Sequence, residues 1–190
     1  NWEDKVTSGK GWAYGAEVFL QKKTGRTTGW IGYTLAWSKR RFPELNQGRI
    51  YPYKYDRRHD ASLVVVHQLS PTLRLSGTFV YGTGNAITLS RGTYLLGPEY
   101  GEFDDYGPRN SYRMRSYQRL DLDLSQTKKK KWGEIVNSFS VYNAYSRRNP
   151  YFMYFQGGYE DPMTGEVRKP TYKQVSLFPI LPSFSKSFRF

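Results

Sequence analysis

The sequence predicts an all-β fold, and more specifically part of a transmembrane, antiparallel, up-and-down β-barrel. Three observations favour this fold. Apolar and polar residues alternate with a period of two along several successive segments. Aromatic residues make up 17% of the chain of 190 residues, yet they stand among charged and hydroxyl residues rather than beside matching aliphatic ones. Short and long connections also alternate, as they do in barrels of the outer membrane.

The alternating segments predict about seven strands. In sequence order, they cover about residues 12–21, 31–38, 61–67, 73–81, 119–125, 135–141 and 172–190. Successive side chains of a strand point to opposite faces, so each segment has an apolar face and a more polar one. The sixth segment is the least regular, because Asn137 and Asn143 interrupt its apolar face.

The fifth segment shows the alternation most clearly. Three alternate leucines, from Leu120 to Leu124, form its apolar face, and Arg119, Asp121 and Asp123 form the opposite face. Two neighbouring carboxyl groups are compatible with a general acid–base pair. Because Arg119 stands beside them, we favour a structural interpretation, in which the three residues form a polar network that faces the barrel lumen.

The connections alternate strictly between short and long. The short ones cover about residues 22–27, 69–72 and 128–133, and the long ones about 39–58, 83–117 and 145–171. In an outer-membrane barrel the short connections are periplasmic turns and the long ones extracellular loops, which places this C-terminus in the periplasm. Bacterial barrels built from one chain have even strand numbers, so seven strands predict that others come from upstream sequence.

Composition excludes several classes of protein. The formal net charge is +13, but no basic helix or nucleic-acid-binding motif is present, so we expect no nucleic-acid partner. The chain has no Cys and two His, which excludes thiol catalysis and leaves no recognisable metal-ligand spacing. It holds no apolar run of about 18 residues, the length of a membrane-spanning helix. It opens at Asn1 without a recognisable export signal, which fits a fragment or a processed piece.

We therefore expect no enzyme activity, no cofactor and no metal site. Glu99, Glu102, Asp104 and Asp105 supply oxygen atoms, but their spacing matches no standard calcium loop. The lysine run 128–131 falls in a predicted short turn, where we interpret it as a solvated segment near anionic lipid headgroups.

The long loops hold the candidate binding residues, which are arginines and tyrosines. Arginine forms bidentate bonds with carboxylate or phosphate, and tyrosine offers a stacking surface and a hydroxyl. The candidates for contact with an extracellular ligand or with lipopolysaccharide are Arg40, Arg41, Tyr53, Arg57, Arg58, Arg109, Tyr112, Arg113, Arg147, Arg148 and Tyr151. Such a surface suits a glycan, a peptide or an anionic ligand. The same chemistry equally supports an alternative, in which these residues bridge lipopolysaccharide phosphates and brace the loops against each other.

The end of the chain carries a further signal. Phe184, Phe188 and Phe190 occupy one face of the last predicted strand. A terminal Phe preceded by aromatic residues at alternate positions resembles the signal that the outer-membrane insertion machinery reads. Lys186 departs from this pattern, because it occupies a position where an apolar residue is usual.

Nearly the whole chain resembles the C-terminal barrel region of TonB-dependent outer-membrane receptors, of the group with an N-terminal carboxypeptidase-regulatory-like domain. The segments that carry the resemblance are GWAYGAEVFLQKKTGRTTGWIGYTLAWSKRRFPELNQG (residues 11–48), YPYKYDRRHDASLVV (51–65), LSGTFVYGTGNAITL (75–89), YGPRNSYRMRSYQRLDLDL (106–124), FSVYNAYSRRNPYF (139–152) and VSLFPILPSFSKSFRF (175–190).

This resemblance implies a 22-stranded barrel that an N-terminal plug blocks. Residues 1–190 would then be about the last seven strands of one barrel domain, without the plug and the N-terminal domains. The implied function is active uptake of a substrate across the outer membrane of a Gram-negative bacterium. The implied partners are outer-membrane lipid and lipopolysaccharide, the remainder of the barrel and its plug, TonB through upstream sequence, and the insertion machinery.

Three further possibilities stay open at this point. A receptor-like barrel can serve as a structural component of a larger outer-membrane assembly, and a surface lipoprotein can cover its loops. The third is a soluble β-domain, an enzyme or an adhesin, with the same alternation, which solubility without detergent would favour. The sequence does not identify the substrate, because ligand contacts in such receptors come from the plug and the loops together.

Overall fold

A computed structural model describes residues 5–95, 102–160 and 163–190 of the chain. The described residues form an all-β structure of antiparallel sheets, with one short 3-10 turn, η2, at Asn46–Gly48. No helix in these ranges is long and apolar enough to cross a membrane.

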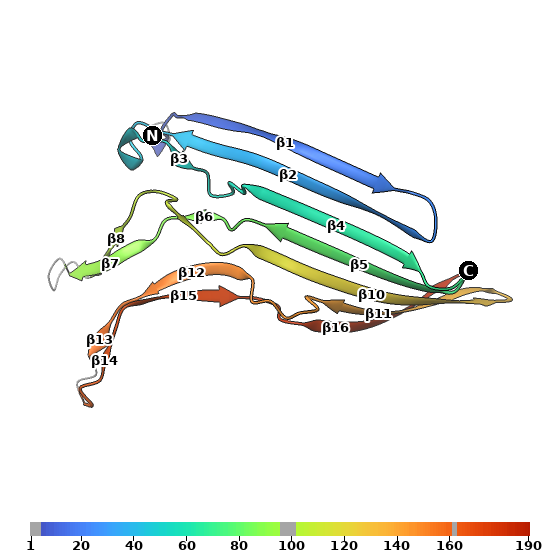
Figure 1. Cartoon of the computed structure of the whole chain (residues 1–190). Helices are drawn as coiled ribbons and strands as arrows, with labels where there is room; N and C mark the ends of the chain where they lie inside the picture. Colours follow the sequence, from blue (N-terminus) through green and yellow to red (C-terminus); the bar gives the residue numbers. More distant parts are fainter. Residues whose placement is uncertain (1–4, 96–101, 161–162) are drawn as a thin grey trace.

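The main sheet contains seven long strands in the order β1-β2-β4-β5-β10-β11-β16, so each strand pairs with the next one of the path (Figure 1). Their bounds are β1 Lys10–Lys22, β2 Thr27–Arg41, β4 His59–Gln68, β5 Leu73–Gly82, β10 Tyr117–Lys130, β11 Gly133–Tyr142 and β16 Leu181–Arg189. The short strand β3, Tyr51–Pro52, pairs with the end of β2. The first six alternating segments, and the C-terminal half of the seventh, are thus confirmed as strands of one antiparallel sheet.

The predicted alternation of short and long connections is also confirmed. Residues 23–26, 69–72 and 131–132 join strands at one end of the sheet, which we call the short-turn end. The long connections lie at the opposite end, the long-loop end (Figure 1). The first one contributes β3 to the edge of β2, and the second and third form β-hairpins of their own. These hairpins pair β6 Ala86–Ile87 with β9 Tyr112–Arg113, β7 Ser90–Leu95 with β8 Glu102–Tyr106, β12 Pro150–Gln156 with β15 Thr171–Ser176, and β13 Tyr159–Glu160 with β14 Val167–Arg168.

Two predicted boundaries were wrong. Residues 172–190 are not one strand, because β15 ends at Ser176 and pairs with β12, while β16 begins only at Leu181. The lysine run was placed in a turn, yet β10 continues to Lys130 and only Lys131 and Trp132 form the turn. At the lysine run, the pairing of β10 with β11 outweighs the local polar composition, whereas residues 177–180 between β15 and β16 take part in no strand.

Strand register aligns the apolar side chains of the seven strands into rows on one face. Residues directly opposite each other in antiparallel strands point to the same face. Leu75 of β5 lies opposite Leu124 of β10, Leu124 opposite Phe139 of β11, and Phe139 opposite Phe184 of β16. The same register joins β1, β2, β4 and β5 through Leu20, Ile31, Leu63 and Phe79. We call this surface the apolar face.

The opposite surface, the polar face, is rich in hydroxyl and charged groups along β5, β10, β11 and β16. Asp123 lies opposite Ser76 and Ser140, and its carboxylate accepts hydrogen bonds from their hydroxyls at 3.5 and 2.7 Å. Ser140 in turn lies opposite Ser183. The face is less polar across β1 and β2, where the rings of Phe19 and Trp30 lie 5.7 Å apart.

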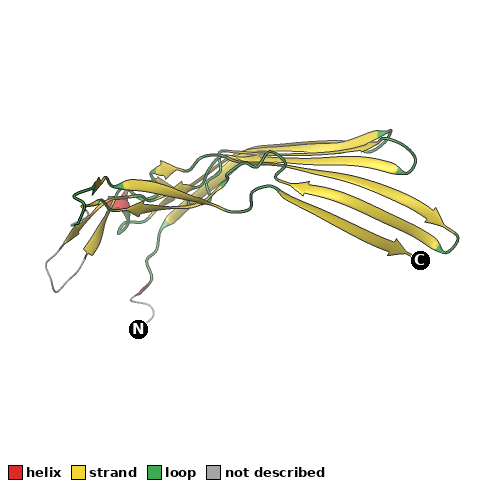
Figure 2. Cartoon of the chain, turned by 90° about the horizontal axis from the view of Figure 1, so that it is seen from below, coloured by secondary structure: helices red, strands yellow, loops and turns green. Residues whose placement is uncertain are grey.

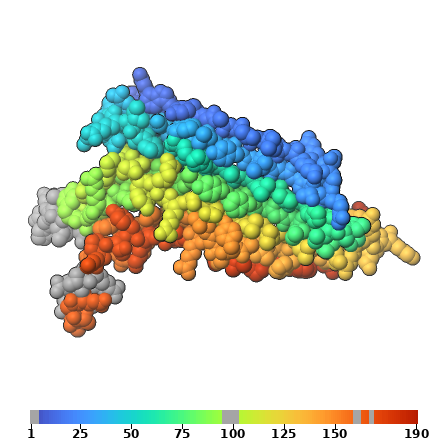
Figure 3. Space-filling view, viewed as in Figure 1, coloured from blue at the N-terminus to red at the C-terminus, as the bar shows by residue number. Residues whose placement is uncertain are grey.

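The described residues have almost no hydrophobic core. Their buried hydrophobic side chains are Tyr51, Ala86 and Met114, all outside the seven long strands. Large apolar side chains of the sheet, such as Leu122 and Phe184, are exposed. Figure 3 shows the strands side by side in one surface, and in Figure 2 the strands near the C-terminus are seen broadside while the strands farther from it are seen nearly edge-on. The sheet is therefore a single curved layer with two exposed faces.

Candidate binding surface of the long loops

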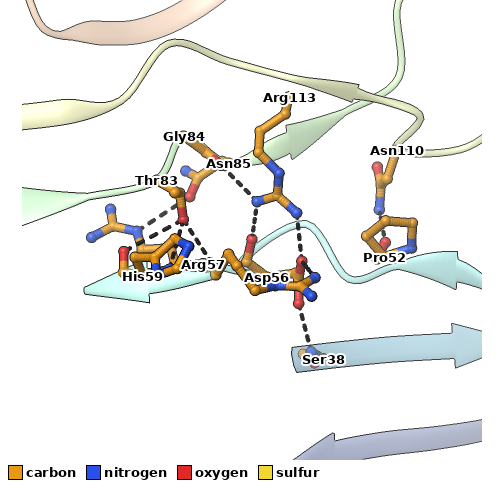
Figure 4. A network of polar contacts seen from close by, with 11 residues as sticks. Ser38, Pro52, Asp56, Arg57, His59, Thr83, Gly84, Asn85, Asn110 and Arg113 are labelled. Carbon is orange, nitrogen blue, oxygen red and sulfur yellow. Dashed lines mark hydrogen bonds and ion pairs between the residues drawn. The ribbon is translucent and has the colours of Figure 1, made fainter. Parts of the chain in front are cut away.

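The long-loop end is organised around one buried carboxylate, Asp56, whose side chain is 1% exposed. It lies between β3 and β4 (Figure 4). The backbone N–H of Ser38 donates to its Oδ1 at 2.6 Å, and the guanidinium groups of Arg58 and Arg113 approach its Oδ2 at 3.2 and 2.5 Å. Arg113 also donates to the backbone carbonyls of Asp56 and, at 2.9 Å, of Gly84. The carboxylate thus connects the first long loop to the second.

The groups around Asp56 determine the ionisation state of its carboxyl group. Burial alone would raise the pKa of the carboxyl group, because it disfavours the charged form. The hydrogen bonds from Ser38, Arg113 and Arg58 outweigh burial, and the pKa is lowered from its ordinary value of 3.8. Asp56 is therefore a carboxylate at neutral pH.

Other side-chain hydrogen bonds join the same two loops. The hydroxyl of Thr83 accepts from the backbone N–H groups of Arg58 and His59 at 2.6 and 3.1 Å (Figure 4). The amide of Asn110 donates to the carbonyl of Pro52 at 2.9 Å, and the N–H of Arg109 donates to Asn46 at 2.9 Å.

The third loop is held by Asn143, which is 1% exposed and has a positive φ of 53°. Its N–H donates to the carboxylate of Asp121 at 2.9 Å. Its side-chain amide donates to the carbonyls of Arg147 and Phe178 at 3.0 and 3.1 Å and accepts from the N–H of Arg147 at 3.0 Å. Asn143 therefore ties both ends of the connection between β11 and β16 to β10.

The predicted contact residues divide into two groups. The first group braces the loops: Arg58 and Arg113 bind Asp56, the Nε of Arg41 donates to Gly48 at 2.8 Å, and Arg147 donates to the carbonyl of Ser116 at 3.0 Å. Arg57 pairs with Asp60 at 3.3 Å. These five arginines therefore brace the loops against each other, which is one of the two interpretations of the loop residues.

The second group presents aromatic rings and guanidinium groups at the surface. The guanidinium of Arg40 lies 3.7 Å from the ring centre of Tyr53, and that of Arg109 lies 5.7 Å from the ring of Tyr51. Tyr112 and Tyr151 are exposed. The side chain of Arg148 has no hydrogen-bond partner among the described residues. Of the predicted residues, Arg40, Tyr53, Arg109, Tyr112, Arg148 and Tyr151 have side chains that a ligand can reach, and Arg41 and Arg57 are exposed as well although they also brace the loops.

Several cavities lie among these loops, and two of them are lined in part by residues of the third loop. One, of about 320 Å³, is lined by Lys54, Asn85, Asn110 and Tyr151 and by the apolar side chains of Phe152 and Met153. The other, of about 380 Å³, is lined by Arg147, Arg148 and Gln174. The buried Nε of Arg147 has no hydrogen-bond partner within the described structure. The first cavity suits a ligand with apolar and polar parts, and the second suits an anion.

The three residues of the predicted polar network of β10 are not all connected to one another. Arg119 donates to the carboxylate of Asp121 at 2.9 Å and to the hydroxyls of Tyr117 and Tyr142 at 2.9 and 3.0 Å. Asp123, in contrast, is bound by serines rather than by Arg119. All three side chains lie on the polar face, opposite the leucines, as the alternation predicts.

Of the aromatic residues at the end of the chain, Phe188 and Phe190 lie at the short-turn end and Phe184 lies near the middle of β16. Phe184 and Phe188 share the apolar face with Phe139 and Ile135, to which they lie opposite. The indole of Trp132 lies 6.2 Å from the ring of Phe188 and 5.5 Å from that of Phe190. Sequence reasoning missed the contribution of Trp132, which sits in a two-residue turn without any alternation around it.

The described residues contain no group of three or more His, Asp and Glu that could hold a metal ion. Glu99, a member of the acidic segment, lies outside the described residues. Comparisons of the chain with protein-family models, with curated proteins and with solved structures find no match. Inference about function therefore depends on the two faces of the sheet, its edges and its loops.

Sequence reasoning also missed Asp56, Thr83, Asn110 and Asn143, the residues that hold the loops together. Asp56 binds Arg113 across 57 positions of the chain, and Asn143 binds Phe178 across 35. No spacing in a single sequence signals such contacts. The one local sign was at Asn143, where a polar residue interrupts an apolar alternation at a strand end.

Proposed function

We propose that residues 1–190 form the C-terminal part of a 22-stranded transmembrane barrel, in a TonB-dependent receptor that takes up its substrate actively across the outer membrane. The observation that carries the proposal is the seven-stranded sheet itself. It has an apolar face and a polar face, both exposed, and the described residues bury almost no apolar side chains between them. Lipid covers the apolar face, and the polar face lines the lumen.

The apolar face supports the proposal that the sheet lies in a membrane rather than in water. Apolar rows cross all seven strands, and exposed apolar patches of more than a few hundred Å² are rare on soluble monomers. A transmembrane strand needs about 9–11 residues, and each of the seven long strands reaches this length. Hydrocarbon in place of water removes the cost of exposing these rows.

The two edges of the sheet support a larger barrel. Among the described residues, β1 pairs only with β2 and β16 only with β11. An unpaired backbone group in lipid costs several kcal/mol, so strands at these edges need partners within the membrane. Further strands of the same protein supply them, and the number 22 follows from the family resemblance.

The connections support one orientation of the barrel. The short-turn end, with the C-terminal Phe188 and Phe190, faces the periplasm, where the insertion machinery reads the signal that these residues form with Phe184. The long-loop end faces the exterior, in contact with lipopolysaccharide. The two cavities beside the third loop, one lined by Tyr151 and the other by Arg148, receive the substrate together with the plug.

Cysteine labelling tests this topology cleanly, because the chain has no Cys of its own. In the full-length protein in intact cells, a membrane-impermeant maleimide labels Tyr151→Cys in the long-loop end without any treatment. It labels Thr24→Cys in a short turn only after the outer membrane is permeabilised. Equal labelling of both positions in intact cells would show that the two ends are not separated by a membrane.

The second candidate is a structural role in a larger outer-membrane assembly. The hydrogen-bonded bracing of the loops through Asp56 and Asn143 favours it, because a rigid loop surface suits a permanent partner. Binding of the full-length protein to the periplasmic domain of TonB separates the candidates. Binding supports transport, whereas its absence, together with co-purification of another outer-membrane protein at fixed stoichiometry, supports the structural role.

A further inference from the structure

Three polar side chains form a row across the apolar face near the short-turn end. Gln126 of β10 lies opposite Asn137 of β11, and Asn137 lies opposite Lys186 of β16. We call these residues the amide–lysine row. Asn137 and Lys186 each interrupt an apolar alternation in the sequence, and the register brings the two interruptions together at one level. Separate irregularities of two strands are thus a single feature of the sheet.

The amide–lysine row has unused hydrogen-bonding capacity. Within the described structure, the side chains of Gln126, Asn137 and Lys186 make no hydrogen bond or ion pair. The ammonium group of Lys186 lies 5.5 Å from the ring centre of Phe188. A polar group in apolar surroundings is costly without a partner. Three such groups side by side therefore call for a ligand that accepts hydrogen bonds.

The charge around the row has one sign. Lys128 and Lys130 follow Gln126 on the same face of β10, whereas Lys129 lies on the polar face opposite Glu134. The apolar face of β10, β11 and β16 carries no Asp or Glu in these strands. Three ammonium groups without a carboxylate between them attract an anion.

The row is flanked on both sides by apolar groups. One step toward the long-loop end lies the row of Leu124, Phe139 and Phe184, about 7 Å away because two residues of a strand advance by that distance. On the other side lies Phe188, packed against Trp132. A ligand of the row therefore has an anionic part and, beside it, a long apolar part.

We propose that the amide–lysine row, with Lys128, binds the phosphate headgroup of an anionic phospholipid, and that its acyl chains lie along Leu124, Phe139 and Phe184. The proposal rests on the membrane location proposed above. A phosphodiester supplies the negative charge and the acceptor oxygens, while the row supplies only amide groups and ammonium donors. A protein partner would need its own acidic residues at this depth of the membrane, where they are rare.

Native mass spectrometry of the full-length protein tests this inference. The protein is reconstituted in nanodiscs of phosphatidylethanolamine with added phosphatidylglycerol, released, and its retained lipids are identified. Lys186→Leu restores the apolar alternation of β16, so this variant is expected to insert. Lys128→Leu removes a charge from the apolar face, and Lys129→Leu is the matched control, since it removes the same charge from the neighbouring position on the polar face.

We expect the native protein and Lys129→Leu to retain phosphatidylglycerol. Lys186→Leu and Lys128→Leu should each bind it roughly five-fold more weakly, since one lysine near the membrane surface contributes about that factor. Equal retention by all four proteins in nanodiscs would overturn the lipid site and leave the barrel standing. If the native protein carries a bound protein instead of phosphatidylglycerol, and Lys186→Leu loses it, then the row binds a protein partner and the lipid site is overturned. Failure of the native protein to enter nanodiscs would overturn the site and the membrane location together.

Discussion

The sheet and the long-loop end of this molecule are held together in opposite ways. In the sheet, backbone pairing aligns seven strands, while apolar side chains such as Leu122 and Phe139 stay exposed. In the loops, buried polar side chains such as Asp56 and Asn143 hold segments distant in sequence through hydrogen bonds. The sheet therefore depends on its surroundings for the stability of its faces, whereas the loops supply their own contacts.

This difference predicts where a substitution acts. In the proposed barrel, a polar substitution on the apolar face is expected to change the interaction with lipid and to affect the whole sheet. A substitution in the loop network is expected to change local order and to leave the sheet intact. Three predictions test the distinction, in order of decreasing effect.

The largest effect is expected from Leu122→Arg, at the middle of the apolar face. An arginine on the lipid face near the bilayer midplane destabilises a barrel by about 2–4 kcal/mol. The control is Thr78→Arg, which places the same residue on the polar face opposite Asp121. Urea unfolding of the full-length protein in lipid measures both. Equal loss of stability in the two variants would contradict the assignment of the faces.

A smaller effect is expected from Asn143→Ala in the third loop. Loss of the side-chain amide leaves the N–H of Arg147 and the carbonyl of Phe178 without partners, which costs roughly 2 kcal/mol of local stability. Alanine at a positive φ adds about 1 kcal/mol of strain. Asn143→Gly removes the same bonds without the strain and serves as the comparison.

Hydrogen exchange reports the outcome for Asn143. Residues 143–149 should lose protection in both variants, more strongly in the Ala variant, while β10 and β11 keep theirs. Loss of protection throughout the sheet would show that the loop network supports the barrel as well, which the account does not predict.

The smallest effect is a dependence of loop order on pH through Asp56. Its pKa is lowered in the folded state, so its stabilising contribution is present above the ordinary value of 3.8 and is lost as the pH falls through the lower folded value. Hydrogen exchange of residues 42–58, corrected for the intrinsic rate, should be constant from pH 7 to about 5 and rise below about 4. Asp56→Asn should remove this dependence and leave the loop less protected at neutral pH.

The sheet could be predicted from the sequence because its signals are local. Alternation from Leu120 to Leu124 places side chains on two faces, and the strand that contains them extends from Tyr117 to Lys130. Lys128–Lys130 were misplaced because local composition favours a turn, while pairing with Gly133–Ile135 continues the strand. The register, and with it the row formed by Gln126, Asn137 and Lys186, requires all three strands at once.

The loops were predictable in composition but not in contacts. Arginines and tyrosines were identified as candidates, yet nothing in the sequence separates Arg113, which binds the buried Asp56, from Arg148, whose side chain is unpaired among the described residues. That distinction depends on which loop segments meet. Asp56 is a short polar side chain in a polar segment, where its type is common and carries no signal of burial, and the only local sign at Asn143 is that it interrupts an apolar alternation.

The most direct test of the central claim is the environment of two neighbouring residues of β10, measured in the full-length protein in lipid. A fluorophore is attached to Leu122→Cys or to Asp123→Cys, and its quenching by brominated lipid is recorded. The account predicts strong quenching at Leu122→Cys and little at Asp123→Cys, because the two side chains point to opposite faces. Equal quenching at both positions would contradict the claim that one face of this sheet meets lipid and the other does not.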